Sequence, residues 1–169
     1  MTNIPVETGP CTLRAPRAGD IGWIVHRHGV LYAKEYGWNE CFEGLVAEVA
    51  GKFLRESDPV RERCWVAERD GAIAGSVFLA RGEGGFAKLR LLYVEPSARG
   101  LGIGELLVRT CVDAARAVGY SGLTLWTTSN LDAARRLYEA AGFRLESEES
   151  FDTFGPTLVG QTWKLSFTE

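Results

Sequence analysis

The stretch LLYVEPSARGLGIGELL, residues 91–107, decides the fold. It begins as an apolar strand that ends at Pro96, and it continues as a helix whose apolar residues recur three and four positions apart. Three glycines, at positions 100, 102 and 104, lie where the strand has ended and the helix begins. Glycine lets backbone N–H groups approach a ligand, and the first N–H groups of a helix are unpaired and lie at its positive end. The segment is therefore predicted to bind a phosphate or pyrophosphate, with Arg99 supplying a fixed charge.

Two familiar phosphate loops are excluded by their spacing. A P-loop needs a Lys-Ser or Lys-Thr pair after its last glycine, and none follows Gly104. A dinucleotide fingerprint needs G-x-G-x-x-G and an acidic residue about twenty positions later. Here the glycines follow a G-x-G-x-G pattern and the acidic residue is missing. Taken alone, the segment could also be a glycine-rich loop that binds nothing.

Working outward, the chain alternates strand and helix patterns around this loop. The Asp70-Gly71 pair predicts a tight hairpin, and Ser129 with Asp132 resembles a capping box at the start of the last helix. Helices followed by an antiparallel meander, and then strand–helix–strand–helix, predict an α/β domain with a mixed sheet. We expect one domain over residues 1–169, with its core at about 11–167. The expected strands are 11–15, 64–68, 73–80, 88–94, 123–128 and two more within 143–167; the expected helices are 18–36, 40–56, 103–118 and 131–141.

Composition narrows the class of protein. The chain has 169 residues, of which 46% are hydrophobic and 24% charged, as in an ordinary globular domain. Nineteen Lys and Arg against 22 Asp and Glu give a net charge of −3, which argues against nucleic acid as the main partner. No apolar run reaches the roughly 18 residues that a membrane span needs, and the N-terminus lacks the pattern of a signal peptide.

The cysteines and histidines predict neither a disulfide framework nor a metal site. The four cysteines are far apart in sequence, and the two histidines show no zinc-ligand spacing with them. We therefore expect buried free thiols, no bound metal and a cytoplasmic protein. The oligomeric state stays open, a homodimer included.

Two motifs together resemble a known superfamily. Arg99-x-x-Gly102-x-Gly104, preceded by the apolar strand and Val94-Glu95-Pro96, resembles the acetyl-CoA pyrophosphate loop of the GNAT superfamily of N-acetyltransferases. LTLWTTSNLDAARRLYEAAGF, residues 123–143, is similar to that family's second motif of strand, helix, Leu-Tyr-Glu and Gly-Phe. The segment 26–38 also resembles the acetyltransferase half of MarR-type fusion proteins. The resemblance implies a mixed, mostly antiparallel sheet of about six to seven strands flanked by about four helices.

The resemblance also implies a cofactor, acetyl-CoA, and roles for particular positions. Tyr138 matches the tyrosine that protonates the departing CoA thiolate, a transfer that a phenol near pKa 10 and a thiol near 8.5 make plausible. Backbone groups of the strand would hold the pantetheine arm and the thioester carbonyl, and the loop would hold the pyrophosphate. The positions implied for cofactor binding are Leu92, Tyr93, Val94, Arg99, Gly100, Leu101, Gly102, Ile103, Gly104, Glu105, Asn130 and Ala134.

Two positions depart from the family pattern. The carboxylate that the family often carries on the strand falls on Trp126, which cannot act as a base. The asparagine expected seven residues before the tyrosine falls on Leu131, and Asn130 lies one position too early. At about 100° per residue, that shift turns the side chain well away from the expected face of the helix. The candidate bases are Glu35, His26, His28 and Glu95, and a water chain to solvent is an equal alternative.

The resemblance implies an N-acetyltransferase that moves an acetyl group from acetyl-CoA to a primary amine by direct attack. One alternative is a non-catalytic module that binds or senses acyl-CoA. Another is an acetyltransferase for protein N-termini or lysines. For the acceptor we expect a pocket formed by Tyr32, Glu35, Tyr36 and Trp38, with the turn 152–160 as a second wall.

Overall fold

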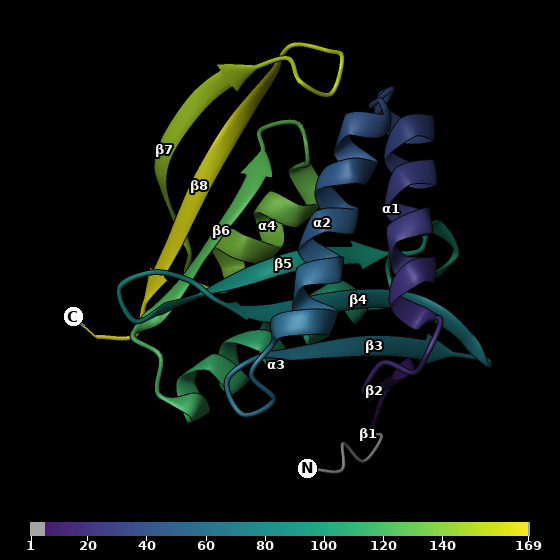
Figure 1. Ribbon diagram of the computed structural model, residues 1–169. Coiled ribbons are helices and arrows are strands. Elements are labelled where there is room, and N and C mark those ends of the chain that lie inside the picture. Colours follow the sequence, from purple (N-terminus) through teal and green to yellow (C-terminus); the bar gives the residue numbers. More distant parts are fainter. Residues whose placement is uncertain (1–5, 169) are drawn as a thin grey trace.

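The computed structural model describes residues 6–168 (Figure 1). Its elements follow the expected order of an early helix pair, an antiparallel meander, and alternating strands and helices. In chain order they are β1 Val6–Thr8, β2 Cys11–Arg14, α1 Asp20–Tyr36, α2 Glu40–Glu56, β3 Arg63–Arg69, β4 Ala72–Arg81, β5 Phe86–Val94, a short 3-10 turn Pro96–Ala98, α3 Ile103–Val118, β6 Gly122–Thr128, α4 Asp132–Ala140, β7 Arg144–Phe151 and β8 Leu158–Ser166.

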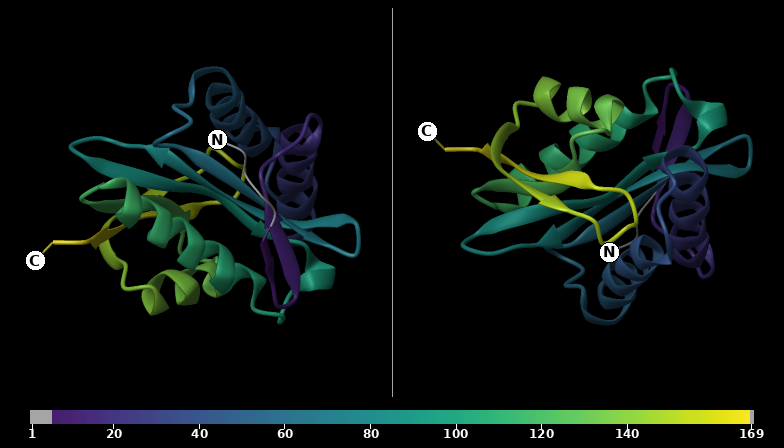
Figure 2. Two further views of the ribbon diagram at one scale, coloured as in Figure 1. Left: turned by 90° about the horizontal axis from the view of Figure 1, so that it is seen from below. Right: turned by 90° about the horizontal axis from the view of Figure 1, so that it is seen from above.

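One sheet carries all the strands, in the order β1-β2-β3-β4-β5-β6-β8-β7. Every neighbouring pair is antiparallel except β5 and β6, which are parallel. Helices α1 and α2 cover one face of the sheet, and α3 and α4 cover the other (Figure 2). The mixed α/β fold is confirmed. Within residues 6–168 the sheet has eight strands, because Val6–Thr8, to which the sequence analysis assigned no element, pairs with β2.

The sheet splits between β5 and β6. Their pairing covers only Phe86–Lys88 against Gly122–Thr124, and beyond it the two strands diverge, as Figure 1 shows. Beside the split, β5 carries a bulge against β4, where Leu91 has a positive φ of 49° and its carbonyl accepts a hydrogen bond from the buried Ser76 hydroxyl at 2.9 Å. The bulge and the split together leave the end of β5 with a free edge.

Helix α3 anchors the sheet on the side of the glycine loop. Its buried stripe includes Ile103, Leu107 and Cys111, all at most 1% exposed. Such a stripe at helical spacing packs against the sheet and fixes where the helix begins. The first turn of α3 is therefore held rigidly next to the end of β5.

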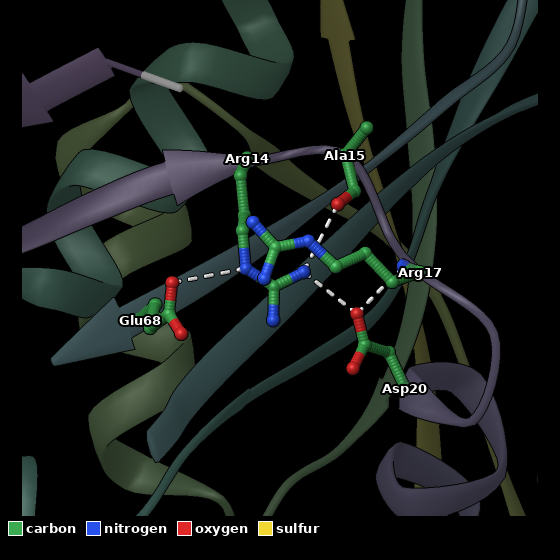
Figure 3. Close-up of polar contacts among 5 residues, drawn as sticks. All are labelled: Arg14, Ala15, Arg17, Asp20 and Glu68. Carbon is green, nitrogen blue, oxygen red and sulfur yellow. Dashed lines mark hydrogen bonds and ion pairs between the residues drawn. The ribbon is translucent and has the colours of Figure 1, made fainter. Parts of the chain in front are cut away.

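Helix α1 is tied to the sheet by a buried cation (Figure 3). Arg14, at the end of β2 and 6% exposed, donates to Asp20 Oδ2 at 2.6 Å and to Glu68 Oε2 at 3.1 Å. Asp20 is the first residue of α1 and also accepts from the backbone N–H of Arg17 at 2.7 Å. Burial would raise the pKa of Asp20, but the hydrogen bonds from Arg14 and Arg17 and the Arg14 charge hold it below its usual value. The cluster fixes the N-terminus of α1 against β2 and β3.

Two local predictions were wrong. Ser129 is not a helix cap, because α4 begins at Asp132 and its N-cap is Leu131, with no side-chain capping bond. Cys41 is exposed, because it occupies the solvent face of the first turn of α2, whereas Cys11, Cys64 and Cys111 are buried free thiols, as expected. Within residues 6–168 no helix is both long and apolar enough to cross a membrane.

Candidate active site

The glycine loop opens into a cavity of about 440 Å³, here called the cofactor-loop cavity. It lies between the end of β5, the start of α3, and the facing sides of α1 and α4. Of the predicted cofactor-binding residues, Leu92, Tyr93, Val94, Arg99, Gly100, Gly102, Ile103, Gly104, Glu105 and Ala134 line it. The structure therefore brings together all but two of them, Leu101 and Asn130.

Backbone donors form the floor of this cavity. Gly100 and Gly102 have positive φ values of 79° and 81°, which L side chains rarely adopt. Gly102 is the N-cap of α3 and no side chain caps the helix. The N–H groups of the first turn therefore have no intrahelical partner and are available to an anion.

Gly104 serves a different purpose from the other two glycines. Its φ is not in the positive range, and a Cβ built on it would lie 2.8 Å from Leu137 Cδ1 of α4. This glycine therefore lets α3 and α4 approach each other beside the cavity. A larger side chain would require the Leu137 side chain to move.

Arg99 is already paired within the protein. Its guanidinium lies 2.7 Å from a carboxylate oxygen of Glu35 on α1, and both residues line the cofactor-loop cavity. Tyr36 lines the same cavity. Glu35 and Tyr36, which we expected near the acceptor, thus lie beside the loop, because α1 approaches the loop at its C-terminal end.

A second cavity of about 460 Å³, here called the aromatic cavity, opens from the split between β5 and β6. Tyr32 and Trp38, both expected near the acceptor, line it together with Phe42 and Trp126. It shares four lining residues with the cofactor-loop cavity, so the two meet at the end of β5. The shared residues are Tyr32, Leu92, Leu131 and Ala134.

The turn between β7 and β8 supports the aromatic wall from behind. Phe154 is buried, and its ring centroid lies 5.1 Å from that of Trp38 and 5.3 Å from that of Phe42. Trp126 covers the backbone of Gly160, where a Cβ would lie 2.9 Å from the indole Nε1. The 152–160 segment therefore supports the rings that line the cavity, but none of its residues lines either cavity, so the second wall that we expected there is not part of the lining.

Tyr138 reaches the aromatic cavity from α4. The side chain is 5% exposed and lines the cavity near the residues shared with the cofactor side. Burial raises the pKa of the Tyr138 phenol, with smaller contributions from Tyr32 and Cys111. The hydroxyl is therefore protonated at neutral pH and can act as a hydrogen-bond or proton donor.

The four candidate bases lie in different environments. Glu95 accepts two hydrogen bonds from Arg27, at 2.7 and 2.8 Å, and Glu35 is paired with Arg99. His26 is exposed on α1. Only His28 lines the aromatic cavity.

His28 is held in one neutral form. Its Nδ1 lies 2.8 Å from the carbonyl of Ile24, which requires the proton on Nδ1 and leaves the Nε2 lone pair free. Burial lowers the pKa of the ring to about 4, although the Ile24 carbonyl opposes the shift. At neutral pH His28 can therefore accept a hydrogen bond but binds a proton weakly.

Asn130 and Leu101 do not line either cavity. Asn130 precedes the N-cap of α4, and its Oδ1 accepts from the Thr128 hydroxyl at 2.6 Å. Leu101 is 40% exposed. Leu131 occupies the position where the family has an asparagine, and it lines both cavities. The spacing of the motif pointed to this position, but a leucine side chain gave no chemical reason to select it.

Comparison with known proteins identifies the family. The model of the acetyltransferase (GNAT) family matches residues 30–143. An uncharacterised N-acetyltransferase of Schizosaccharomyces pombe is 31% identical over 114 residues, which is 67% of this chain and 70% of that protein. An N-acetylaspartate synthetase of Danio rerio is 36% identical over 118 residues, 69% of this chain but only 39% of that protein.

Solved structures agree at the level of the fold. An acetyltransferase of Salmonella typhimurium, solved with acetyl-CoA, superposes with a TM-score of 0.72 at 21% identity, over 94% of this chain and 95% of that one. The finer resemblance to MarR-type fusion proteins stays a prediction. The chain therefore belongs to the acetyltransferase (GNAT) family and is an N-acetyltransferase.

Proposed function

We propose that the chain transfers the acetyl group directly from acetyl-CoA to a small primary amine, with the two cavities holding the two substrates. The observation that carries this proposal is their meeting at the free edge of β5, beside Leu92 and Tyr138. A cofactor held along the loop would present its thioester at this junction. An amine in the aromatic cavity would approach from the opposite side.

The backbone binds the cofactor in this proposal. The first turn of α3 and the loop from Arg99 to Glu105 hold the pyrophosphate, and Arg99 exchanges Glu35 for a phosphate oxygen. The free edge of β5 from Leu92 to Val94 holds the pantetheine arm. A backbone N–H of this edge binds the thioester oxygen as negative charge develops on it.

Side chains complete the transfer. The neutral amine attacks the thioester carbon, and the C–S bond breaks as the tetrahedral intermediate collapses. Tyr138 donates its proton to the departing sulfur, and the proton that the attacking nitrogen gives up returns to Tyr138 through water. His28, neutral with a free Nε2, orients the amine by accepting one of its N–H bonds. Because His28 binds a proton weakly, the amine loses its proton to water at the mouth of the cavity, beside the exposed Trp126.

The size of the aromatic cavity favours a small molecule over a folded protein as the acceptor. Its volume of about 460 Å³ falls in the range of small-ligand sites, about 300–1,000 Å³. Incubation with acetyl-CoA and a panel of amines, followed by release of free thiol, tests the proposal. Tight binding of acetyl-CoA without thiol release on any amine would favour a non-catalytic module instead.

A further inference from the structure

The aromatic cavity contains an unusual pair of charges. Among the described residues that line it, only Lys88 and Arg90 are charged, and none is a carboxylate. Both lie on β5, in the middle of the sheet, and alternate positions of a strand point to the same face. Basic residues are rarely placed within a central strand unless they are paired.

Neither cation is paired within residues 6–168. Arg90 also borders a smaller hollow of about 300 Å³ that is lined by Glu48, Glu56 and Glu62, yet it forms no ion pair with them. Glu62 is bonded instead to the backbone N–H groups of Asp58 and Arg81. Burial lowers the pKa of the Arg90 guanidinium. Burial also lowers the pKa of the Lys88 ammonium, and the charge of Arg90 lowers it further.

The positions of Lys88 and Arg90 along β5 indicate the length of the molecule that would bind. Arg90 precedes Leu92 by two residues and Lys88 precedes it by four, so at roughly 3.3 Å per residue they start about 7 and 13 Å from the reacting end. The rings of Phe42 and Trp126 line the same cavity. A bound molecule would therefore place an apolar body between its two polar ends.

We propose that the acceptor is a primary amine that carries a carboxylate, with an apolar or aromatic body between the two groups. The amine lies at Leu92 and Tyr138, and the carboxylate is bound by Arg90 with Lys88 beside it. The planar guanidinium fork matches a carboxylate in geometry as well as charge. A diamine is disfavoured, because its second ammonium would lie beside two cations without a carboxylate to pair with. This inference specifies the substrate class of the proposed function and rests on it.

Binding tests the inference without turnover. With CoA already bound, calorimetry compares 4-(aminomethyl)benzoate with 4-(aminomethyl)benzamide, which differ only in the acid group. A charge-assisted hydrogen bond corresponds to an affinity ratio of about 10- to 100-fold in favour of the acid. Arg90→Gln should remove that ratio, and Arg90→Lys should retain part of it. Arg109→Gln, which removes an exposed charge from α3 and lines neither cavity, should leave the ratio unchanged.

Equal binding of the acid and the amide overturns the inference, as does binding of neither, or a ratio that survives Arg90→Gln. Thiol release in the presence of acetyl-CoA separates this failure from that of the proposed function. Acetylation of the amide at the rate of the acid leaves the transfer standing without a carboxylate site. Preferential binding of the acid with no thiol release on any amine leaves the carboxylate site standing without the transfer.

Discussion

The two cavities share four residues but are built in opposite ways. Ten of the eighteen residues that line the cofactor-loop cavity come from one stretch of chain, from Leu92 to Glu105, which includes its glycines. The aromatic cavity is lined by residues of α1, α2, β5, β6, α4 and β8, which are distant from one another in sequence. A backbone site tolerates change in most of its side chains and depends on its glycines, whereas a side-chain site changes its ligand with each substitution. One protein can therefore keep its cofactor while its acceptor changes.

Removing the phenol of Tyr138 should have the largest effect. Tyr138→Phe keeps the buried ring and deletes the proton donor, so kcat should fall by about 10²–10⁴-fold, as for other general acids. The Kd for acetyl-CoA should stay within a few-fold, because Tyr138 does not line the cofactor-loop cavity. Single-turnover kinetics and calorimetry measure the two quantities.

Tyr120→Phe is the control for this variant. Tyr120 is also buried, and its hydroxyl donates to the backbone carbonyl of Arg61, away from both cavities. Tyr120→Phe should lower the free energy of unfolding but leave kcat unchanged. Wild-type turnover in Tyr138→Phe would mean that the thiolate departs without this proton.

Gly102→Val should impair binding in the cofactor-loop cavity without affecting the aromatic cavity. The φ of 81° strains a β-branched residue, and the added side chain stands where an anion would approach the α3 N–H groups. Loss of charge-assisted bonds should weaken CoA binding by about 100-fold. Binding of an acceptor amine to the aromatic cavity, measured without CoA, should change little.

Gly84→Val separates strain from ligand contact. Gly84 also has a positive φ, 61°, with open space around it, but it lies in the turn between β4 and β5. If the two glycine variants weaken CoA binding equally, the loop backbone is not the anion site.

The contrast between the cavities explains what the sequence could predict. The loop and its glycines are adjacent in the chain, so the motif and the family that it resembles identified ten of the eighteen residues that line the cofactor-loop cavity; most of the others come from α1 and α4. Tyr138 followed from the second motif in the same way. The backbone geometry of a contiguous segment is determined mainly by its own residues, and tertiary packing changes that geometry little.

The aromatic cavity was harder to predict because its walls come from distant segments. Tyr32 and Tyr36 are one helical turn apart on α1, yet only Tyr32 lines the aromatic cavity. The sequence could not show that α1 ends beside the glycine loop, which moves Glu35 to the cofactor side. Lys88 and Arg90, in contrast, alternate with leucines in KLRLLYV, and that pattern could have indicated a charged face on a central strand.

Arg14→Met should destabilise the attachment of α1 to the sheet and so affect both cavities. Helix α1 lines both, and Arg14 ties its first residue, Asp20, to the sheet (Figure 3). Because Asp20 and Glu68 remain partly exposed, the expected loss in the free energy of unfolding is about 1–3 kcal/mol, below that of a fully buried pair. Urea unfolding measures it. Arg109→Met, which removes an exposed cation from α3 on the other face of the sheet, is the control.

The loss should depend on pH in a defined direction. The folded-state pKa of Asp20 is below its ordinary value of 3.8, so the stability from its charged form is present above that value and is lost as pH falls through the lowered pKa. The difference in unfolding free energy between the wild type and Arg14→Met should stay constant from about pH 6 to 8 and shrink below about pH 5. A difference that grows on acidification would contradict the Arg14–Asp20 contact.

Glu35→Gln should have the smallest effect and should distinguish the two cavities most directly. Glu35 is paired with Arg99 beside the loop, where its charge opposes a phosphate. The pair is partly exposed, and such pairs contribute about 0–1 kcal/mol. The variant releases Arg99 and removes the repulsion, so CoA should bind a few-fold more tightly at low salt, with the gain fading as salt screens the charges. The acceptor KM should not change, because Glu35 does not line the aromatic cavity.

Glu40→Gln, at the exposed start of α2, controls for the loss of one negative charge. A raised acceptor KM with unchanged CoA affinity in Glu35→Gln would mean that the amine site extends to the C-terminal end of α1, and the division between the two cavities would be wrong.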